Sequence, residues 1–129
     1  VDVLRRPEVE GEVPAWEIYI NGGRKATGID ALEWVEELVD RGVGELVLNS
    51  IDADGTREGY DLALNQEVAR RVRVPIVASG GAGNLDHIYE VLTEGEVSAA
   101  LAASIFHFQQ YSIPEVKDFL RERGVVVRQ

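Results

Sequence analysis

The stretch VPIVASGGAGNLDH, Val74–His87, joins an apolar strand-like run to a helix-like segment through a loop that is rich in glycine. The apolar run ends at Ser79, and three of the next four residues are glycine. Glycine weakens regular structure and raises the entropy cost of folding. We therefore expect that another group approaches the backbone closely at this strand end.

The rest of the chain repeats this alternation of strand and helix. Leu32, Val35 and Leu38 are spaced so that they fall on one face of a helix, whereas WEIYIN alternates with the period of a strand. The segment Gly22–Gly28 is predicted to be a loop, and Thr27 or Asp30 to cap the helix that follows. The predicted strands are Val1–Leu4, Trp16–Asn21, Glu45–Ile51, Pro75–Ser79 and Ala99–Ser104, and the predicted helices are Ala31–Arg41, Leu62–Arg73, Leu85–Glu94 and Ser112–Arg123.

The element order predicts an α/β fold with parallel strands, in units of roughly 30 residues. Residues 1–129 are expected to form one domain. A weak internal repeat supports the βα units, because Gly42 and Gly95 each precede a strand that ends in Ser-Ile. Parallel α/β folds bind ligands at the carboxyl ends of their strands. Function is therefore expected in three segments: Asn49–Asp61, Ser79–Asn84 and Ala103–His107.

The composition fits one soluble globular domain, with 45% hydrophobic and 28% charged residues among 129. A formal charge of -10 disfavours nucleic-acid and anionic-membrane surfaces. The lack of cysteine excludes disulfides and thiolate chemistry. No apolar run approaches ~20 residues and no signal-like start is seen, so a cytoplasmic location is expected. The lack of methionine, even at position 1, indicates a piece or processed product of a longer chain.

Small residues at three neighbouring strand ends favour an anion site. The glycine loop around Gly81 offers bare amides and leads into a helix N-terminus, a combination that attracts anions. The next strand ends in Ala103 and Ser104, and Gly55 lies in the preceding loop. The three loops are expected to converge on one phosphate. The alternative is that these glycines only make tight turns, and GGAGNLD matches neither a P-loop nor a dinucleotide fingerprint.

The loop IDADGTREGYD carries carboxylates whose roles differ. Asp61 is expected to cap the helix that begins at Leu62, whereas Asp54 beside Gly55 is the better candidate for ligand contact. The spacing does not match a calcium-binding EF-hand loop. The two histidines lie on different predicted elements without a companion ligand, which disfavours zinc, and His87 is expected on an outer helix.

Two more carboxylates lie at opposite ends of predicted strands. Asp2 is expected at the C-terminal end of the first strand, on the same rim as the functional loops, where it is a cap or loop residue as often as a catalytic one. Glu45 begins its strand and therefore lies at the opposite mouth, either solvated or in a ring of ion pairs.

Four segments together resemble the cyclase subunits of imidazole glycerol phosphate synthase, the HisF family. They are GGRKATG, GELVLNSIDADGTREGYDL, PIVASGGAGN and LAASIFHF, and the resemblance runs from Asp2 to Arg128. A related isomerase of histidine biosynthesis shares the DGT loop, but its last strand usually ends differently from AASIFHF. The resemblance implies that this chain is the C-terminal half of a (β/α)8 TIM barrel, with four βα units and parallel strands.

The resemblance also implies a reaction and a set of residues. Such cyclases receive ammonia from a glutaminase partner, without a metal or other cofactor. They convert a bis-phosphorylated formimino aminoimidazole carboxamide ribonucleotide to imidazole glycerol phosphate and aminoimidazole carboxamide ribonucleotide. By the match, Asp2 is one of two catalytic aspartates. Gly55, Gly81, Ala103 and Ser104 hold a phosphate, Asn49, Asp54 and Ser79 line the substrate groove, and Glu45 belongs to a gate for ammonia.

The departures from the family pattern leave alternatives open. Arg5–Ala15 is longer than in compact members, Gly95–Ala99 holds one extra residue, and the N-terminal half with the other catalytic aspartate is absent from this sequence. The chain could instead be a phosphate-binding half-barrel without catalysis, or a structural subunit. The strand that ends at Asp2 and the strand Ala99–Ala103 are expected to be open edges of the sheet, and Val47, Ile76 and Leu101 are expected on its uncovered face. These open edges predict that the chain pairs with an N-terminal half-barrel or with copies of itself, and that alone it is inactive.

Overall fold

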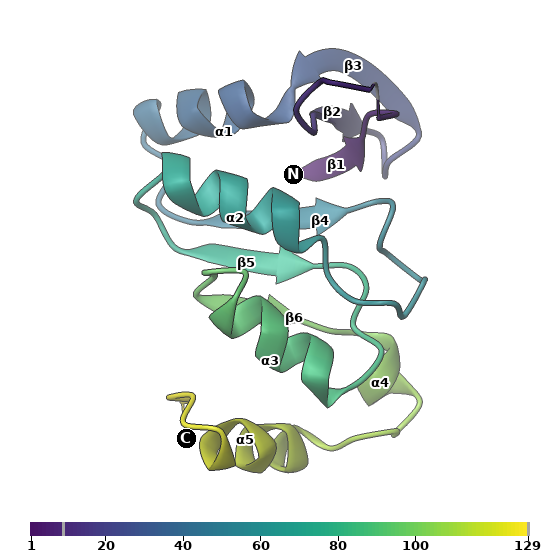
Figure 1. Cartoon of the computed structure of the whole chain (residues 1–129), viewed down its shortest axis with the longest axis vertical. Coiled ribbons are helices and arrows are strands. Elements are labelled where there is room, and N and C mark those ends of the chain that lie inside the picture. Colours follow the sequence, from purple (N-terminus) through teal and green to yellow (C-terminus); the bar gives the residue numbers. More distant parts are fainter. Residues whose placement is uncertain (9, 129) are drawn as a thin grey trace.

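The computed structural model describes residues 1–8 and 10–128, which form one six-stranded sheet with helices on one side (Figure 1). The sheet order is β3-β2-β1-β4-β5-β6. The strands are β1 (Asp2–Arg5), β2 (Trp16–Ile20), β3 (Lys25–Asp30), β4 (Leu46–Ser50), β5 (Ile76–Ser79) and β6 (Ala99–Leu101). The helices are α1 (Ala31–Asp40), α2 (Leu62–Arg71), α3 (Leu85–Thr93), α4 (Ser104–His107) and α5 (Ile113–Glu122).

The predicted α/β fold with four βα units is confirmed. Strands β1, β4, β5 and β6 run parallel, and a helix follows each of them along the chain, after the β2–β3 segment in the case of β1. Local signals set these helix starts, because Asp30, Asp61 and Asn84 each accept hydrogen bonds from the first turn of α1, α2 and α3. Ser112 and Glu115 form a capping box at the start of α5.

The predicted strand Trp16–Asn21 is present as β2, but it belongs to an antiparallel hairpin that the sequence did not predict. Part of the expected loop Gly22–Gly28 is strand β3, which pairs antiparallel with β2, as β2 does with β1. Asn21, Gly22 and Gly23 have φ angles of 58°, 67° and 75°, and this left-handed backbone reverses the chain within a tight turn. The hairpin is inserted between β1 and α1, so it extends the sheet without disturbing the βα order.

Helices α1, α2 and α3 cover one face of the sheet and enclose the core (Figure 1). Along β4, Leu46 and Leu48 are buried whereas Val47 between them is 42% exposed. Val35, Val68 and Val91, one from each of the three helices, are fully buried. The alternation along β4 means that the helices pack on one side only and leave the other face of the sheet open.

The open face and the sheet edges differ in part from the prediction. Val47 and Leu101 are exposed as expected, but Ile76 is only 3% exposed because its side chain points to the helices. Strand β6 is an edge, as predicted. Strand β1 is not, because β2 pairs with it and the other edge is β3.

No helix within residues 1–8 and 10–128 is long and apolar enough to cross a membrane.

Candidate anion site at the strand ends

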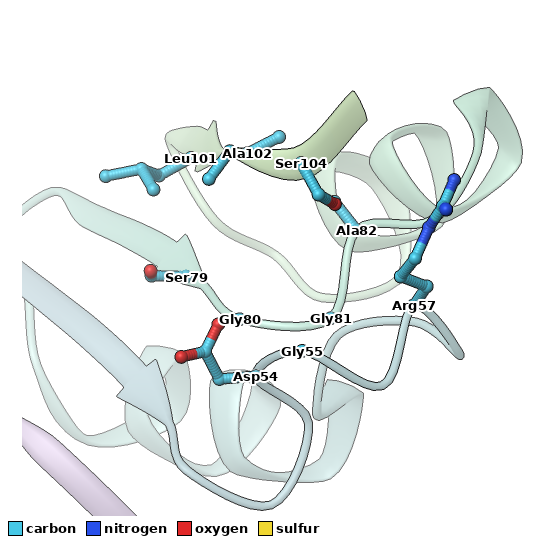
Figure 2. Close-up of a pocket in the computed structure, with 11 residues that line it drawn as sticks. Asp54, Gly55, Arg57, Ser79, Gly80, Gly81, Ala82, Leu101, Ala102 and Ser104 are labelled. Carbon is cyan, nitrogen blue, oxygen red and sulfur yellow. The ribbon is translucent and has the colours of Figure 1, made fainter. Parts of the chain in front are cut away.

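Three loops meet at the carboxyl ends of β4, β5 and β6 and enclose a pocket of about 100 Å³ (Figure 2). This volume exceeds what a single water molecule needs. The first loop joins β4 to α2, the second joins β5 to α3, and the third joins β6 to α4. The lining residues are Asp54, Gly55, Arg57, Ser79, Gly80, Gly81, Ala82, Leu101, Ala102, Ala103 and Ser104.

The structure brings together the four residues predicted to hold a phosphate. Gly55, Gly81, Ala103 and Ser104 all line the pocket. Within the part of the chain that the structure describes, their backbone amides donate to no protein acceptor. Gly81 is buried and Ser104 is half-buried, so an amide there without a partner is costly unless water or a ligand accepts from it, whereas Gly55 and Ala103 are exposed. The pocket thus offers several unpaired donors to an anion.

Gly81 and Gly83 are required because the backbone of the loop between β4 and α2 packs against them, whereas the sequence suggested that a ligand needs this space. A Cβ atom on Gly81 would lie 1.9 Å from the carbonyl oxygen of Gly59, and one on Gly83 would lie 2.0 Å from that of Arg57. The Gly59 amide also donates to the Gly81 carbonyl at 2.9 Å. The group that approaches this backbone closely is therefore the neighbouring loop.

Buried Tyr60 links two of the loops around the pocket, and the sequence analysis did not predict this role. Its hydroxyl donates to the Leu101 carbonyl at 2.9 Å, which ties the loop after β4 to the end of β6. Burial raises the pKa of Tyr60 well above its ordinary value, so the hydroxyl remains a donor. The neighbouring Asp61 caps α2 as predicted and also accepts from the Trp16 indole at 2.9 Å.

Asp2, Asn49 and Ser79 form a hydrogen-bonded row across three adjacent strands. Asp2 pairs in register with Asn49, and Asn49 with Ser79. The Asn49 amide donates to the Asp2 carboxylate at 3.0 Å and accepts from the Ser79 hydroxyl at 3.1 Å. Asp2 is the first residue of β1 rather than its last, because β1 continues into the unpredicted hairpin. It nevertheless lies level with the ends of β4 and β5.

The row joins the pocket through Ser79, which belongs to both. Asp54 lines the pocket next to Ser79, on the side opposite Arg57 (Figure 2). The site therefore combines unpaired amides at one end with a carboxylate held by an amide side chain at the other. This arrangement can bind an anionic group and present a carboxylate for proton transfer nearby.

Glu45 is separated from this site. It precedes β4, is exposed, and lies at the amino end of the strand, as the sequence predicts. Across the residues that the structure describes, no group of three or more histidine, aspartate or glutamate side chains is placed to hold a metal ion.

His87 lies in the first turn of α3 and holds the glycine loop. Its Nδ1 accepts from the Gly83 amide at 3.1 Å, and its own amide donates to Asn84. A Cβ atom on Gly59 would lie 3.5 Å from the Cδ2 atom of the His87 ring. His87 is thus a structural contact between two of the three loops.

A mostly parallel α/β sheet that is covered on one face and carries a pocket at its strand ends defines a half-barrel protein. The chain belongs to the histidine biosynthesis protein family, whose pattern it matches over residues 1–112.

Three curated relatives are similar over 128 residues, and each is named imidazole glycerol phosphate synthase subunit HisF. They come from Symbiobacterium thermophilum, Microcystis aeruginosa and Synechocystis sp., at 58%, 55% and 50% identity. The matched part is 99% of this chain and 48–50% of each relative. The chain thus spans about half the length of the relatives that it matches.

Proposed function

We propose that this chain is the C-terminal half of the cyclase subunit of an imidazole glycerol phosphate synthase. The observation that carries the proposal is the identity of 50–58% to subunits of that name along nearly the whole chain. The related isomerase is not favoured, because the three relatives are all named as the synthase subunit.

The pocket binds one phosphate group of a bis-phosphorylated substrate. The unpaired amides of Gly55, Gly81 and Ser104, with that of Ala103, support this assignment because they come from three separate loops around one space. A hydrogen bond from an amide to a charged oxygen contributes about 1.5–3 kcal/mol. Several such bonds hold a phosphate without requiring a net positive surface.

Asp2 serves as a general acid or base on the same substrate. The hydrogen bond from Asn49 fixes its carboxylate, and the Ser79 hydroxyl fixes the Asn49 amide in turn. Such second-tier contacts keep a catalytic group in a productive orientation. Asp54 and Ser79 line the part of the groove between the phosphate and Asp2.

A second half-barrel covers the open face of the sheet. Val47 and Leu101 are 42% and 45% exposed there, and β6 has an unpaired edge. Apolar exposure of this kind favours association, at about 25 cal/mol per Å² buried. The partner is an N-terminal half-barrel or, in its absence, another copy of this chain. A glutaminase subunit supplies ammonia at the opposite mouth, where Glu45 belongs to the gate.

Two measurements test the proposal. Amide NMR spectra recorded during titration with inorganic phosphate are expected to shift at Gly55, Gly81 and Ser104, and unchanged spectra there would remove the phosphate site. Ammonia-dependent turnover is expected only after mixing with the N-terminal half of a HisF subunit. A mixture that assembles, by light scattering, without turnover would instead favour a phosphate-binding half-barrel without catalysis.

A further inference from the structure

Arg57 differs from six other arginines because it has no carboxylate partner. Among the residues that the structure describes, no carboxylate lies within 4.0 Å of the Arg57 guanidinium. Arg24, Arg73 and Arg123 share this feature within the described part of the chain. Arg57 also lines the anion pocket and is its only positively charged lining residue. The arginines that do pair with carboxylates are Arg5, Arg6, Arg41, Arg70, Arg71 and Arg121.

The backbone of Arg57 is fixed although its side chain is exposed. Its φ angle is 61°, a left-handed conformation that glycine or asparagine adopts at lower cost. Its carbonyl oxygen packs so closely on Gly83 that only glycine fits there. The chain thus accepts strain at a position that carries the one cation on the pocket rim. The packing of its carbonyl group places the point where the Arg57 side chain leaves the backbone at the rim of the pocket.

The guanidinium is held by a neutral group. It donates to the side-chain oxygen of Gln110, which lies in the segment between α4 and α5. The Gln110 amide in turn lies 3.5 Å from the Gly83 carbonyl oxygen. Figure 2 shows that the Arg57 side chain extends away from Asp54 and Gly55. A hydrogen bond to a neutral amide leaves the positive charge uncompensated and available to an anion.

We propose that Arg57 binds the phosphate group in this pocket by exchanging its hydrogen bond to Gln110 for one to the anion. The inference rests on the proposed phosphate site and adds a side chain to it. The amides of the three loops position the anion, whereas Arg57 supplies the charge that favours a phosphate dianion over neutral oxygen ligands. Gln110 holds the guanidinium in a defined place while the pocket is empty.

The first test is a calorimetric titration of the chain with inorganic phosphate. Arg57→Gln is expected to weaken binding about five- to tenfold, as for the loss of one charge-assisted hydrogen bond at a partly exposed site. The variant removes the positive charge and keeps the first three side-chain carbons. Arg24→Gln is the control, because it changes the net charge equally in the distant turn between β2 and β3. Equal affinities of Arg57→Gln and Arg24→Gln would overturn the role of Arg57. Absence of binding by the wild type would instead overturn the phosphate site.

The second test addresses the exchange itself. Gln110→Glu gives Arg57 a charged partner and is expected to weaken phosphate binding. In the Arg57→Gln background, Gln110→Glu is expected to have a much smaller effect, because the new carboxylate no longer has an arginine to pair with. An equal effect in both backgrounds would mean simple repulsion by Glu and would overturn the exchange. In NMR spectra, the Arg57 Nε–H signal is expected to shift on addition of phosphate, and an unchanged signal would also count against it.

Discussion

Gly81→Ala tests whether the docking of two backbones shapes the anion pocket. The added Cβ would lie 1.9 Å from the Gly59 carbonyl oxygen, whereas real Cβ contacts are essentially never under 3.0 Å. The loops must therefore separate by about 1 Å or more, which stretches the hydrogen bond of 2.9 Å from the Gly59 amide. Alanine also has to adopt a φ of 108°, which costs about 1–2 kcal/mol.

The two costs together predict a loss of about 2–4 kcal/mol in the free energy of unfolding. Urea unfolding followed by circular dichroism measures this loss. Gly42→Ala is the matched control, because Gly42 has a φ of 99° at the exposed end of α1 and no atom within 4 Å of its added Cβ. The control variant is expected to lose only the part due to φ.

Equal losses in the two variants would refute the docking argument. A second measurement separates docking from general stability. Phosphate titration of folded Gly81→Ala is expected to show little binding, because separated loops no longer direct their amides to one point. Full phosphate affinity in that variant would mean that the loop contact does not shape the pocket.

Three further predictions concern single residues. In an assembled barrel, Asp2→Asn is expected to lower ammonia-dependent turnover by about 10²–10⁴-fold at similar substrate affinity, and wild-type turnover would exclude Asp2 as the acid or base. Tyr60→Phe is expected to reduce the free energy of unfolding by about 1 kcal/mol, measured in urea, because the Leu101 carbonyl loses its donor; an unchanged midpoint contradicts this. Hydrogen bonds from the Ser112 side chain and then its backbone lower the pKa of Glu115. Since the folded pKa lies below the unfolded one, this contribution to stability is complete above the unfolded pKa and disappears as pH falls through the folded pKa. The first turn of α5 is therefore expected to fray in acid, as followed by NMR chemical shifts, and Glu115→Ala, which removes the acceptor, is expected to fray at all pH values.

The sequence was sufficient where local signals decide the structure. Helices α1 and α3 end within one residue of their predicted bounds, because apolar spacing and a capping side chain both lie within the helix itself. Strand β3 was missed for a physical reason. It is an exposed edge strand whose residues show no apolar alternation, and its glycine-rich turn resembles any polar loop.

The candidate site shows the same division. The convergence of Gly55, Gly81 and Ser104 could be predicted, because parallel strands place their carboxyl ends at one edge. The Tyr60 hydrogen bond and the Arg57–Gln110 pair could not, because they join residues 41 and 53 positions apart and depend on how the loops pack. The sequence predicted correctly that another group approaches the glycine backbone closely. It suggested a ligand as that group, whereas the structure places the neighbouring loop there.

That difference changes what defines this kind of anion site. In a phosphate loop that is recognised from one motif, glycines let the ligand approach the backbone directly. Here Gly81 and Gly83 admit the carbonyl groups of the neighbouring loop, and Gly81 also lines the pocket. The phosphate binding that we propose therefore depends on the contact between loops from separate βα units. Conditions that loosen this contact without unfolding the helices should weaken phosphate binding before the secondary structure is lost.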